Sequence, residues 1–166
     1  EDEQLANDFK VFRNYGSEKR YHNKVVGANS RLDELQAGLL RVRLQHMQEL
    51  TEEKVKIAKR YTAEISNDKI RLPELADGAT GVWHQYVIRC EERDRLIEYL
   101  NEKEIGTIIH YPIPPHLAEA YQYLGHKPGF LPITEHLAET VLSIPMYNGM
   151  TEEEQSYVIE ALNAFH

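Results

Sequence analysis

The sequence predicts an α+β protein in which one long helix is followed by a small unit of short strands and helices. Apolar residues keep a helical spacing over residues 30–67, and no proline interrupts them. Downstream, short stretches with the two-residue alternation of strands are interleaved with short helical patterns. One long helix before a mixed unit of this size is typical of an α+β arrangement.

Composition limits the possible partners and cellular location. The 166 residues, 42% of them hydrophobic, suit one domain, or one domain with a short piece of a neighbour. A net charge of -8 argues against nucleic acid as a partner, because binding phosphate backbones needs clustered cations. No apolar stretch approaches the roughly 18 residues of a membrane span. A single cysteine, Cys90, cannot form an internal disulfide, so we expect a cytoplasmic protein without a membrane partner.

The chain is expected to open with a helix over residues 5–12, followed by a loop over residues 13–22. Leu5, Phe9 and Phe12 have helical spacing, whereas the next segment is polar and aromatic, without a period, and is broken by Gly16. Within the loop, Lys19, Tyr21 and His22 are candidate site residues. The alternative is that these side chains are simply solvated.

The long helix is predicted to begin at Ser30. Ser30 and Asp33 have the spacing of a capping box, in which each side chain answers a free backbone N–H of the first turn. The helical pattern continues to Asn67, which exceeds the usual length of a globular helix and suggests a spine between two domains.

The remaining elements are short. A final helix is expected to open at Thr151, where Glu154 completes a second capping box. Proline cannot donate to a sheet, so the prolines after Tyr111 should end the strand before them. Strands are predicted at residues 82–90, 107–111 and 141–144, and helices at residues 93–103, 117–123 and 133–140.

Common cofactor and metal motifs are absent from the sequence. It contains no glycine-rich dinucleotide fingerprint, no P-loop, no H-E-x-x-H and no C-x-x-C. Four of the eight histidines, His110, His116, His126 and His136, are six to ten residues apart, which matches no ligand pattern. We therefore expect no metal site.

Two segments concentrate polar groups that could bind a ligand. The first, GANSR at residues 27–31, would place Asn29 and Arg31 at a helix N-terminus, where free N–H groups and the helix dipole favour a phosphate. The second, GTIIHYPIPPH at residues 106–116, would project His110 and Tyr111 from a strand end made rigid by prolines. Each segment also has a purely structural alternative. In the first, Asn29 and Ser30 cap the helix and Arg31 is solvated. In the second, His110 forms a local hydrogen bond and Tyr111 packs against the protein.

These segments, in order, resemble the sugar aminotransferases of the DegT/DnrJ/EryC1/StrS family. The resemblance rests on RNYGS at residues 13–17, GANSRLDELQA at residues 27–37, GTIIHYPIPPH at residues 106–116 and LSIPMY at residues 142–147. Four motifs in one order along nearly the whole chain are highly specific.

The resemblance implies the C-terminal part of a fold-type I transferase that uses pyridoxal 5'-phosphate. Residues 1–29 would end the large cofactor-binding domain, residues 30–67 would connect the domains, and residues 68–166 would form the small domain. That small domain is expected to contain an antiparallel sheet of about three strands with flanking helices. Members form homodimers with shared active sites.

The resemblance also suggests roles for individual residues. Asn29 matches the asparagine that reaches the cofactor phosphate of the partner subunit, and Arg31 is assigned to the phosphate or the sugar nucleotide. His110, with Tyr111 behind it, matches a contact to the sugar, and Lys19 and Tyr21 are further substrate candidates. The implied reaction transfers an amino group, usually from glutamate, to a nucleotide-linked keto-deoxysugar. The two prolines before His116 favour a deoxythymidine diphosphate sugar.

The catalytic lysine motif of the family does not occur in these 166 residues, so the chain alone is expected to be inactive. The pathways implied are cell-surface polysaccharide, including lipopolysaccharide O-antigen, or secondary-metabolite sugar biosynthesis. Two alternatives remain open: a related cofactor-dependent sugar dehydratase, and a non-catalytic interaction or dimerisation domain with the same fold.

Overall fold

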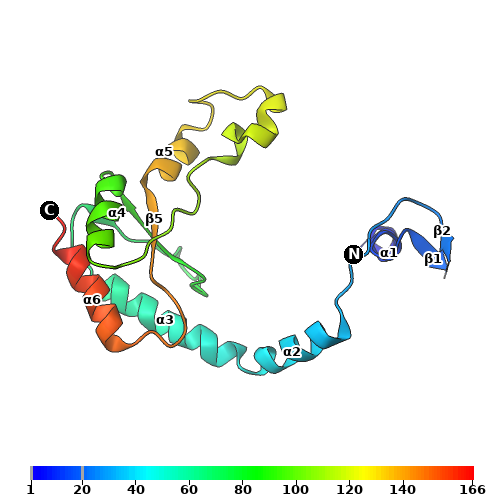
Figure 1. Ribbon diagram of the computed structural model, residues 1–166, viewed down its shortest axis with the longest axis horizontal. Helices are drawn as coiled ribbons and strands as arrows, with labels where there is room; N and C mark the ends of the chain where they lie inside the picture. The colour runs from blue at the N-terminus through cyan, green and yellow to red at the C-terminus, as the bar shows by residue number, and fades with distance from the viewer. Residues whose placement is uncertain (1, 20) are drawn as a thin grey trace. The chain divides into compact units, whose positions relative to one another are not determined.

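The computed structural model describes residues 2–19 and 21–166 and divides the chain into two compact units, Glu1–Met47 and Gln48–His166. Figure 1 shows the order of the elements along the chain. Within the described residues, no helix is both long and apolar enough to cross a bilayer.

The first unit begins with a helix and a small hairpin. Helix α1 (Glu3–Phe12) confirms the helix that the apolar spacing predicted for this segment. Asp2 caps it, because its carboxylate accepts a hydrogen bond from Leu5 N. The segment predicted to be an irregular loop contains an antiparallel pair, β1 (Ser17–Lys19) and β2 (His22–Asn23). Strands this short carry too few residues to show alternation in the sequence.

Two glycines allow the chain to fold back on itself after the hairpin. Gly16 has a φ of +68°, and a Cβ placed on it would lie 1.8 Å from the carbonyl oxygen of Val25. A Cβ on Gly27 would lie 2.1 Å from the backbone nitrogen of Gly16. Only glycine can occupy positions of such close backbone approach. The returning segment is thereby held beside the end of α1.

The long helix differs from its prediction at its start and in its continuity. Helix α2 (Glu34–Gln45) begins at Glu34 with Asp33 as its N-cap, so the capping box predicted at Ser30 is wrong. Ser30 instead lies in an extended segment, where its backbone N–H donates to the Arg13 carbonyl over 3.0 Å. His46 interrupts the helical hydrogen bonding, and α3 (Met47–Glu64) follows.

The second unit contains a three-stranded antiparallel sheet in the order β3 (Ile70–Arg71), β4 (Tyr86–Cys90), β5 (Val141–Ile144). The central pairing of β4 with β5 sets Tyr86 opposite Ile144 and Val87 opposite Ser143. The prediction of β5 over residues 141–144 is confirmed. An α+β unit with a small antiparallel sheet is therefore the observed architecture.

Two of the predicted strands are wrong in extent. Residues 82–85 lie outside β4, because Trp83 has a left-handed φ of 48° that a strand cannot contain. Residues 107–111 form only an isolated bridge, in which Ile108 and Ser143 exchange two backbone hydrogen bonds of 3.2 and 2.8 Å. The third strand of the sheet is instead β3, whose two residues are too few to show alternation.

The helices of the second unit agree more closely with the sequence pattern. The capping box at Thr151 and Glu154 is confirmed and opens α6 (Glu152–Asn163). The segment at residues 117–123 is built from 3-10 turns instead of an α-helix. The other helical elements are α4 (Arg93–Glu102), the turns η1 (Pro115–Leu117) and η2 (Glu119–Leu124), and α5 (Pro132–Thr140).

The core of this unit lies between the sheet and helices α3, α4 and α6. Tyr61 of α3 and Tyr86 of β4 are fully buried, and their rings meet edge-on with centroids 5.2 Å apart. Such an aromatic pair contributes about 0.5–1.5 kcal/mol beyond its area burial. The Tyr61 hydroxyl donates to the Pro145 carbonyl over 2.9 Å, and burial raises the pKa of that hydroxyl. Helices α3 and α6 lie side by side in Figure 1.

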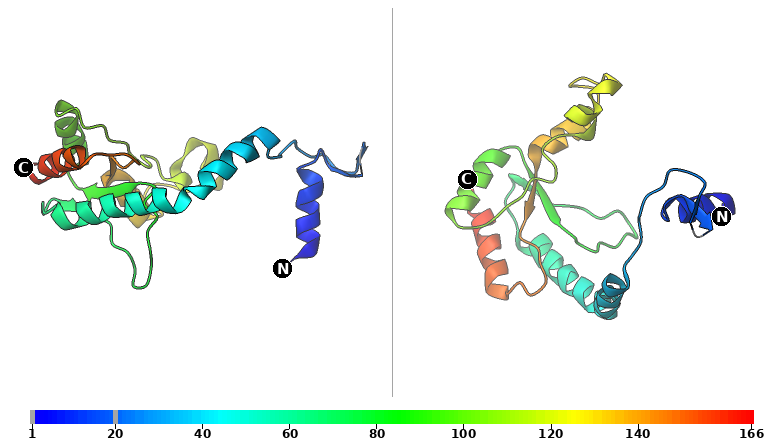
Figure 2. Two further views of the ribbon diagram at one scale, coloured as in Figure 1. Left: turned by 90° about the horizontal axis from the view of Figure 1, so that it is seen from below. Right: turned by 45° about the vertical axis from the view of Figure 1, so that its right-hand side comes forward.

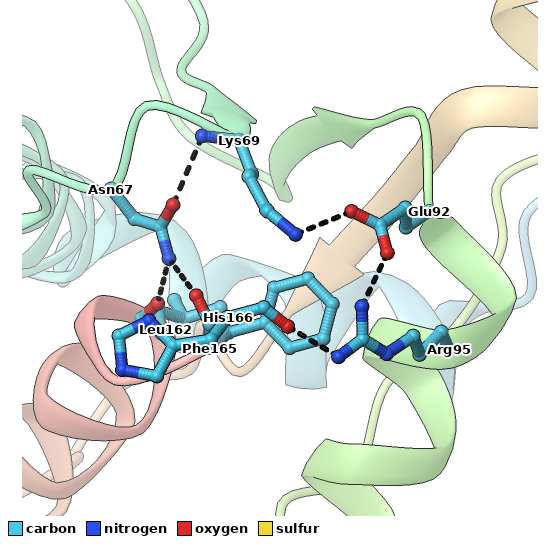
Figure 3. Close-up of polar contacts among 7 residues, drawn as sticks. All are labelled: Asn67, Lys69, Glu92, Arg95, Leu162, Phe165 and His166. Atoms are coloured by element: carbon cyan, nitrogen blue, oxygen red, sulfur yellow. Dashed lines mark hydrogen bonds and ion pairs between the residues drawn. The ribbon is translucent and has the colours of Figure 1, made fainter.

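The end of α6 and the residues after it are anchored to α4 and to the segment between α3 and β3. Asn67 Nδ2 donates to the carbonyls of Leu162 and Phe165, and the Arg95 guanidinium donates to the His166 carbonyl (Figure 3). Arg95 also stacks on the Phe165 ring, with its Cζ 5.3 Å from the centroid. The final residues therefore form part of the fold.

A long connection joins the bridge at Ile108 to α5 and extends away from the sheet (Figure 2). It is held by the Glu135 carboxylate, which accepts hydrogen bonds from the backbone N–H groups of Gly129 and Leu131 and from Nε2 of buried His116. These contacts, led by that of Gly129, lower the pKa of Glu135. The ionised carboxylate is thus the form that stabilises the connection.

Replacing Glu135→Gln should lower the melting temperature at neutral pH, because the neutral amide accepts these bonds less well. In the folded protein the pKa of Glu135 is lower than in the unfolded chain. The stabilisation by its carboxylate is therefore complete above the unfolded-state pKa and is lost as the pH falls through the folded-state pKa. The difference between wild type and variant should therefore shrink in acid. Thermal melts followed by circular dichroism between neutral and acid pH would measure it. Exposed Glu139→Gln on the same helix is the control, and an equal, pH-independent loss in both would contradict the assignment.

Candidate functional site

The candidate substrate-contact residue His110 lies at a surface cavity of about 210 Å³ in the second unit. The exchange of hydrogen bonds between Ile108 and Ser143 fixes the chain two residues before the histidine. His84 and Met146 also line this cavity. The motifs at residues 106–116 and 142–147, far apart in the sequence, therefore meet at one place.

A hydrogen bond to Ser143 holds the imidazole of His110. Nδ1 of His110 lies 2.9 Å from Ser143 Oγ, and Ser143 is only 7% exposed. A partner on one ring nitrogen fixes the orientation of the ring and so the direction of the other nitrogen. Nε2 of His110 has no hydrogen-bond partner among the described residues, which leaves it for a ligand.

Tyr111 is arranged differently from its neighbour. Its side chain is 72% exposed, and its ring meets that of His110 edge-on with centroids 5.4 Å apart. The alternative hypothesis, in which the Tyr111 side chain packs against the protein, is therefore wrong within this chain. Of these two adjacent rings, that of His110 is held by Ser143 and that of Tyr111 lies largely in solvent.

The second candidate cluster, in the first unit, joins Asn29, Arg31 and Tyr15. Arg31 Nε donates to Asn29 Oδ1 over 3.0 Å, and the guanidinium carbon lies 5.4 Å from the centroid of the Tyr15 ring. Asn29 itself lies in an extended segment bridged to Asn14. It precedes the first residue of α2 by five positions, so the predicted location at a helix N-terminus is wrong.

The donors in this cluster fit a phosphate group, such as that of pyridoxal phosphate. Because Arg31 occupies the amide oxygen of Asn29, the amide presents Nδ2, which donates to no other described residue. The guanidinium retains its two terminal nitrogens. An amide N–H and a guanidinium together can supply several hydrogen bonds to phosphate oxygens, and those from the cation are charge-assisted.

The remaining loop candidates lie on the hairpin of the first unit. Lys19 ends β1 and is the register partner of His22 in β2. Tyr21, near the hairpin tip, has a φ of 67° and is 83% exposed. Their roles in binding substrate stay a prediction.

Sequence reasoning missed Ser143 and Tyr15 as members of these clusters. Both lie inside family motifs, LSIPMY and RNYGS, so the motifs were the available signal. Their roles depend on pairing between distant segments, which the motifs by themselves do not show. His84 at the cavity was missed for the same reason.

Three further histidines of the second unit have local structural contacts. His116 Nε2 bonds to Glu135, the His126 ring stacks on Phe130 with centroids 4.1 Å apart, and His136 Nε2 lies 3.4 Å from Glu91. Over residues 2–19 and 21–166, no group of three or more histidine, cysteine or acidic side chains is arranged to hold a metal ion.

The sequence and the fold correspond to a known class of protein. The model of the DegT/DnrJ/EryC1/StrS aminotransferase family matches residues 1–163. The chain belongs to this family. Aminotransferases of the family depend on pyridoxal phosphate, and solved structures with a similar fold include forms with this cofactor and with its amino form, PMP.

Curated relatives and a solved structure are similar along almost the whole chain. The chain is 42% identical to the erythromycin biosynthesis sensory transduction protein EryC1 of Saccharopolyspora erythraea, over 98% of this chain and 45% of the relative. It is also 42% identical to the dTDP-3-amino-3,6-dideoxy-alpha-D-galactopyranose transaminase of Aneurinibacillus thermoaerophilus, over 99% of this chain and 45% of the relative. The crystal structure of Streptomyces venezuelae DesV with a ketimine intermediate superposes with a TM-score of 0.91 at 37% identity, covering 98% of this chain and 44% of DesV. The chain thus spans less than half the length of these relatives.

Replacing Ser143→Ala should free the His110 ring while the sheet remains intact, because the backbone exchange with Ile108 does not need the hydroxyl. We expect the ring nitrogen signals of His110 in long-range 1H–15N spectra to change, because Nδ1 loses its hydrogen-bond partner. Exposed Ser66→Ala is the control and should leave them unchanged. Identical His110 signals in wild type and Ser143→Ala would show that the hydrogen bond does not hold the ring.

Proposed function

We propose that this chain is the C-terminal part of a pyridoxal-phosphate-dependent aminotransferase that acts on a nucleotide-linked keto-deoxysugar. The observation that carries the proposal is the match to the aminotransferase family over residues 1–163. The dTDP-sugar transaminases among its relatives support a nucleotide sugar as the acceptor. Several of the similar relatives are named as transaminases, which favours amino transfer over the dehydratase alternative.

Asn29 and Arg31 are the proposed contacts to the cofactor phosphate. The amide Nδ2 and the guanidinium donate to phosphate oxygens, and the contact of Arg31 with Tyr15 limits the freedom of the guanidinium. We propose that this phosphate belongs to the cofactor of the partner subunit in a homodimer. When bound, pyridoxal phosphate supplies the carbonyl carbon that carries the amino group between donor and acceptor.

His110 is the proposed contact to the sugar. Ser143 orients its ring, so Nε2 is directed to a hydroxyl or carbonyl of the substrate, and exposed Tyr111 adds an aromatic surface beside it. Lys19 and Tyr21 on the hairpin are proposed as further substrate contacts. A dTDP-linked sugar is the proposed substrate, with glutamate as the amino donor.

The chain alone is proposed to be inactive, because the family's lysine motif is absent from its 166 residues. Residues 1–29 would complete the large domain, residues 30–67 would connect the domains, and residues 68–166 would form the small domain.

We place the enzyme in the cytoplasm and in sugar biosynthesis for cell-surface polysaccharide or secondary metabolites. The lone cysteine, Cys90, is buried, and its burial raises the pKa of the thiol.

In the full-length protein, Asn29→Ala should weaken retention of pyridoxal phosphate by about tenfold, the equivalent of one charge-assisted hydrogen bond. Affinity for pyridoxal, which lacks the phosphate, should not change. Equilibrium dialysis with both compounds measures the difference, and exposed Asn101→Ala is the matched control. Unchanged retention of pyridoxal phosphate would remove Asn29 from the phosphate site.

In the same protein, His110→Ala should reduce turnover of the sugar while cofactor loading stays near normal. Truncating a group that contacts only the sugar costs transition-state or substrate binding and leaves the phosphate site intact. Steady-state kinetics with a dTDP-linked keto-sugar, together with cofactor absorbance, separates the two effects. Replacing His126, whose ring stacks on Phe130, by alanine is the control. Loss of folding in His110→Ala would favour the alternative in which His110 serves only the local structure.

A further inference from the structure

Two arginines lie directly opposite each other on the sheet. Arg71 of β3 and Arg89 of β4 are register partners, so their side chains leave the sheet on the same face. Their strand neighbours Ile70, Ile88 and Cys90 are at most 6% exposed and belong to the core. By the alternation of strands, both arginines lie on the opposite face.

Neither guanidinium forms an ion pair within the part of the chain that the structure describes. No carboxylate there forms an ion pair with Arg71 or Arg89, although acidic groups outnumber lysine and arginine by eight. The neighbouring cations are paired: Lys69 and Arg95 share Glu92, as Figure 3 shows. Like charges directly opposite on two strands destabilise their pairing. An anion between them would offset this repulsion.

Both arginines line the same two cavities. One cavity, of about 470 Å³, lies between them and the segment that follows β3, and also reaches Glu74. The other, of about 320 Å³, reaches Lys69 and His136. Asp68 and Glu91 also line this second cavity. The Glu91 carboxylate lies 3.4 Å from His136 Nε2, and neither Asp68 nor Glu91 forms an ion pair with the two arginines.

We propose that Arg71 and Arg89 form a binding site for an oxyanion of a small molecule, either a phosphate group or a carboxylate. The planar guanidinium presents paired N–H donors that match the spacing of oxygens in both groups. An oxyanion held between the two side chains removes their repulsion. The inference goes beyond the proposed function, since none of the residues that line these two cavities lines the cavity at His110.

The test uses the 166-residue chain at low ionic strength with three probes: inorganic phosphate, pyrophosphate and succinate. Amide chemical shifts followed during each titration should saturate and should change most along β3 and β4. The probe with the lowest dissociation constant tells whether a phosphate or a carboxylate is preferred. Loss of one charge-assisted contact should weaken that probe by about tenfold in Arg71→Gln and in Arg89→Gln.

Matched variants separate a site from general attraction to positive charge. Arg41→Gln on α2 removes the same charge elsewhere and should leave affinity unchanged. Arg89→Lys keeps the charge but loses the paired donors, so it should bind more weakly than wild type. Circular dichroism checks that each variant is folded.

Three results would overturn the proposal. They are the absence of saturation with all three probes, shifts that cluster away from β3 and β4 in the wild-type chain, and equal weakening in the Arg41→Gln control. If both glutamine variants fail to fold, the location of the shifts in the wild-type chain decides the question.

Discussion

The alternation of side chains across the paired strands β4 and β5 is the constraint on which the second unit depends. Pairing Tyr86 with Ile144 directs both into the core, and the same register directs Ser143 to the other face. A shift by one residue would exchange the two faces. The core therefore also determines where the hydroxyl that holds His110 lies, so stability and the candidate site follow from one register.

The same alternation explains the charged surface of the sheet. Arg89 follows buried Ile88 and precedes buried Cys90, so it must leave the sheet opposite the core. Pairing with β3 then brings Arg71 beside it. Two cations placed together on the outer face of a small sheet are easier to understand as a ligand site than as a contribution to folding, because their mutual repulsion opposes the pairing of the strands.

In the first unit, close backbone approach replaces side-chain packing. None of the residues of α1 is buried, and the unit is held by backbone hydrogen bonds and by the contact between Gly16 and Gly27. This contact returns the chain beside the end of α1, where Asn29 bridges to Asn14. The amide and guanidinium proposed for the cofactor phosphate are thus positioned by glycines that have no chemical role of their own.

The sequence by itself determined the elements with strong local signals: α1, α4, α5, β5 and the capped start of α6. It also determined the family, because four motifs occur in order. It named Asn29 and His110 as candidate site residues, whose roles stay a prediction. Only the tertiary structure decided that Ser30 is extended instead of capping a helix, that β3 completes the sheet, and that Ser143 holds His110. Local spacing reports helical and strand periods, whereas these features depend on hydrogen bonds between residues far apart in the chain, which no local pattern records.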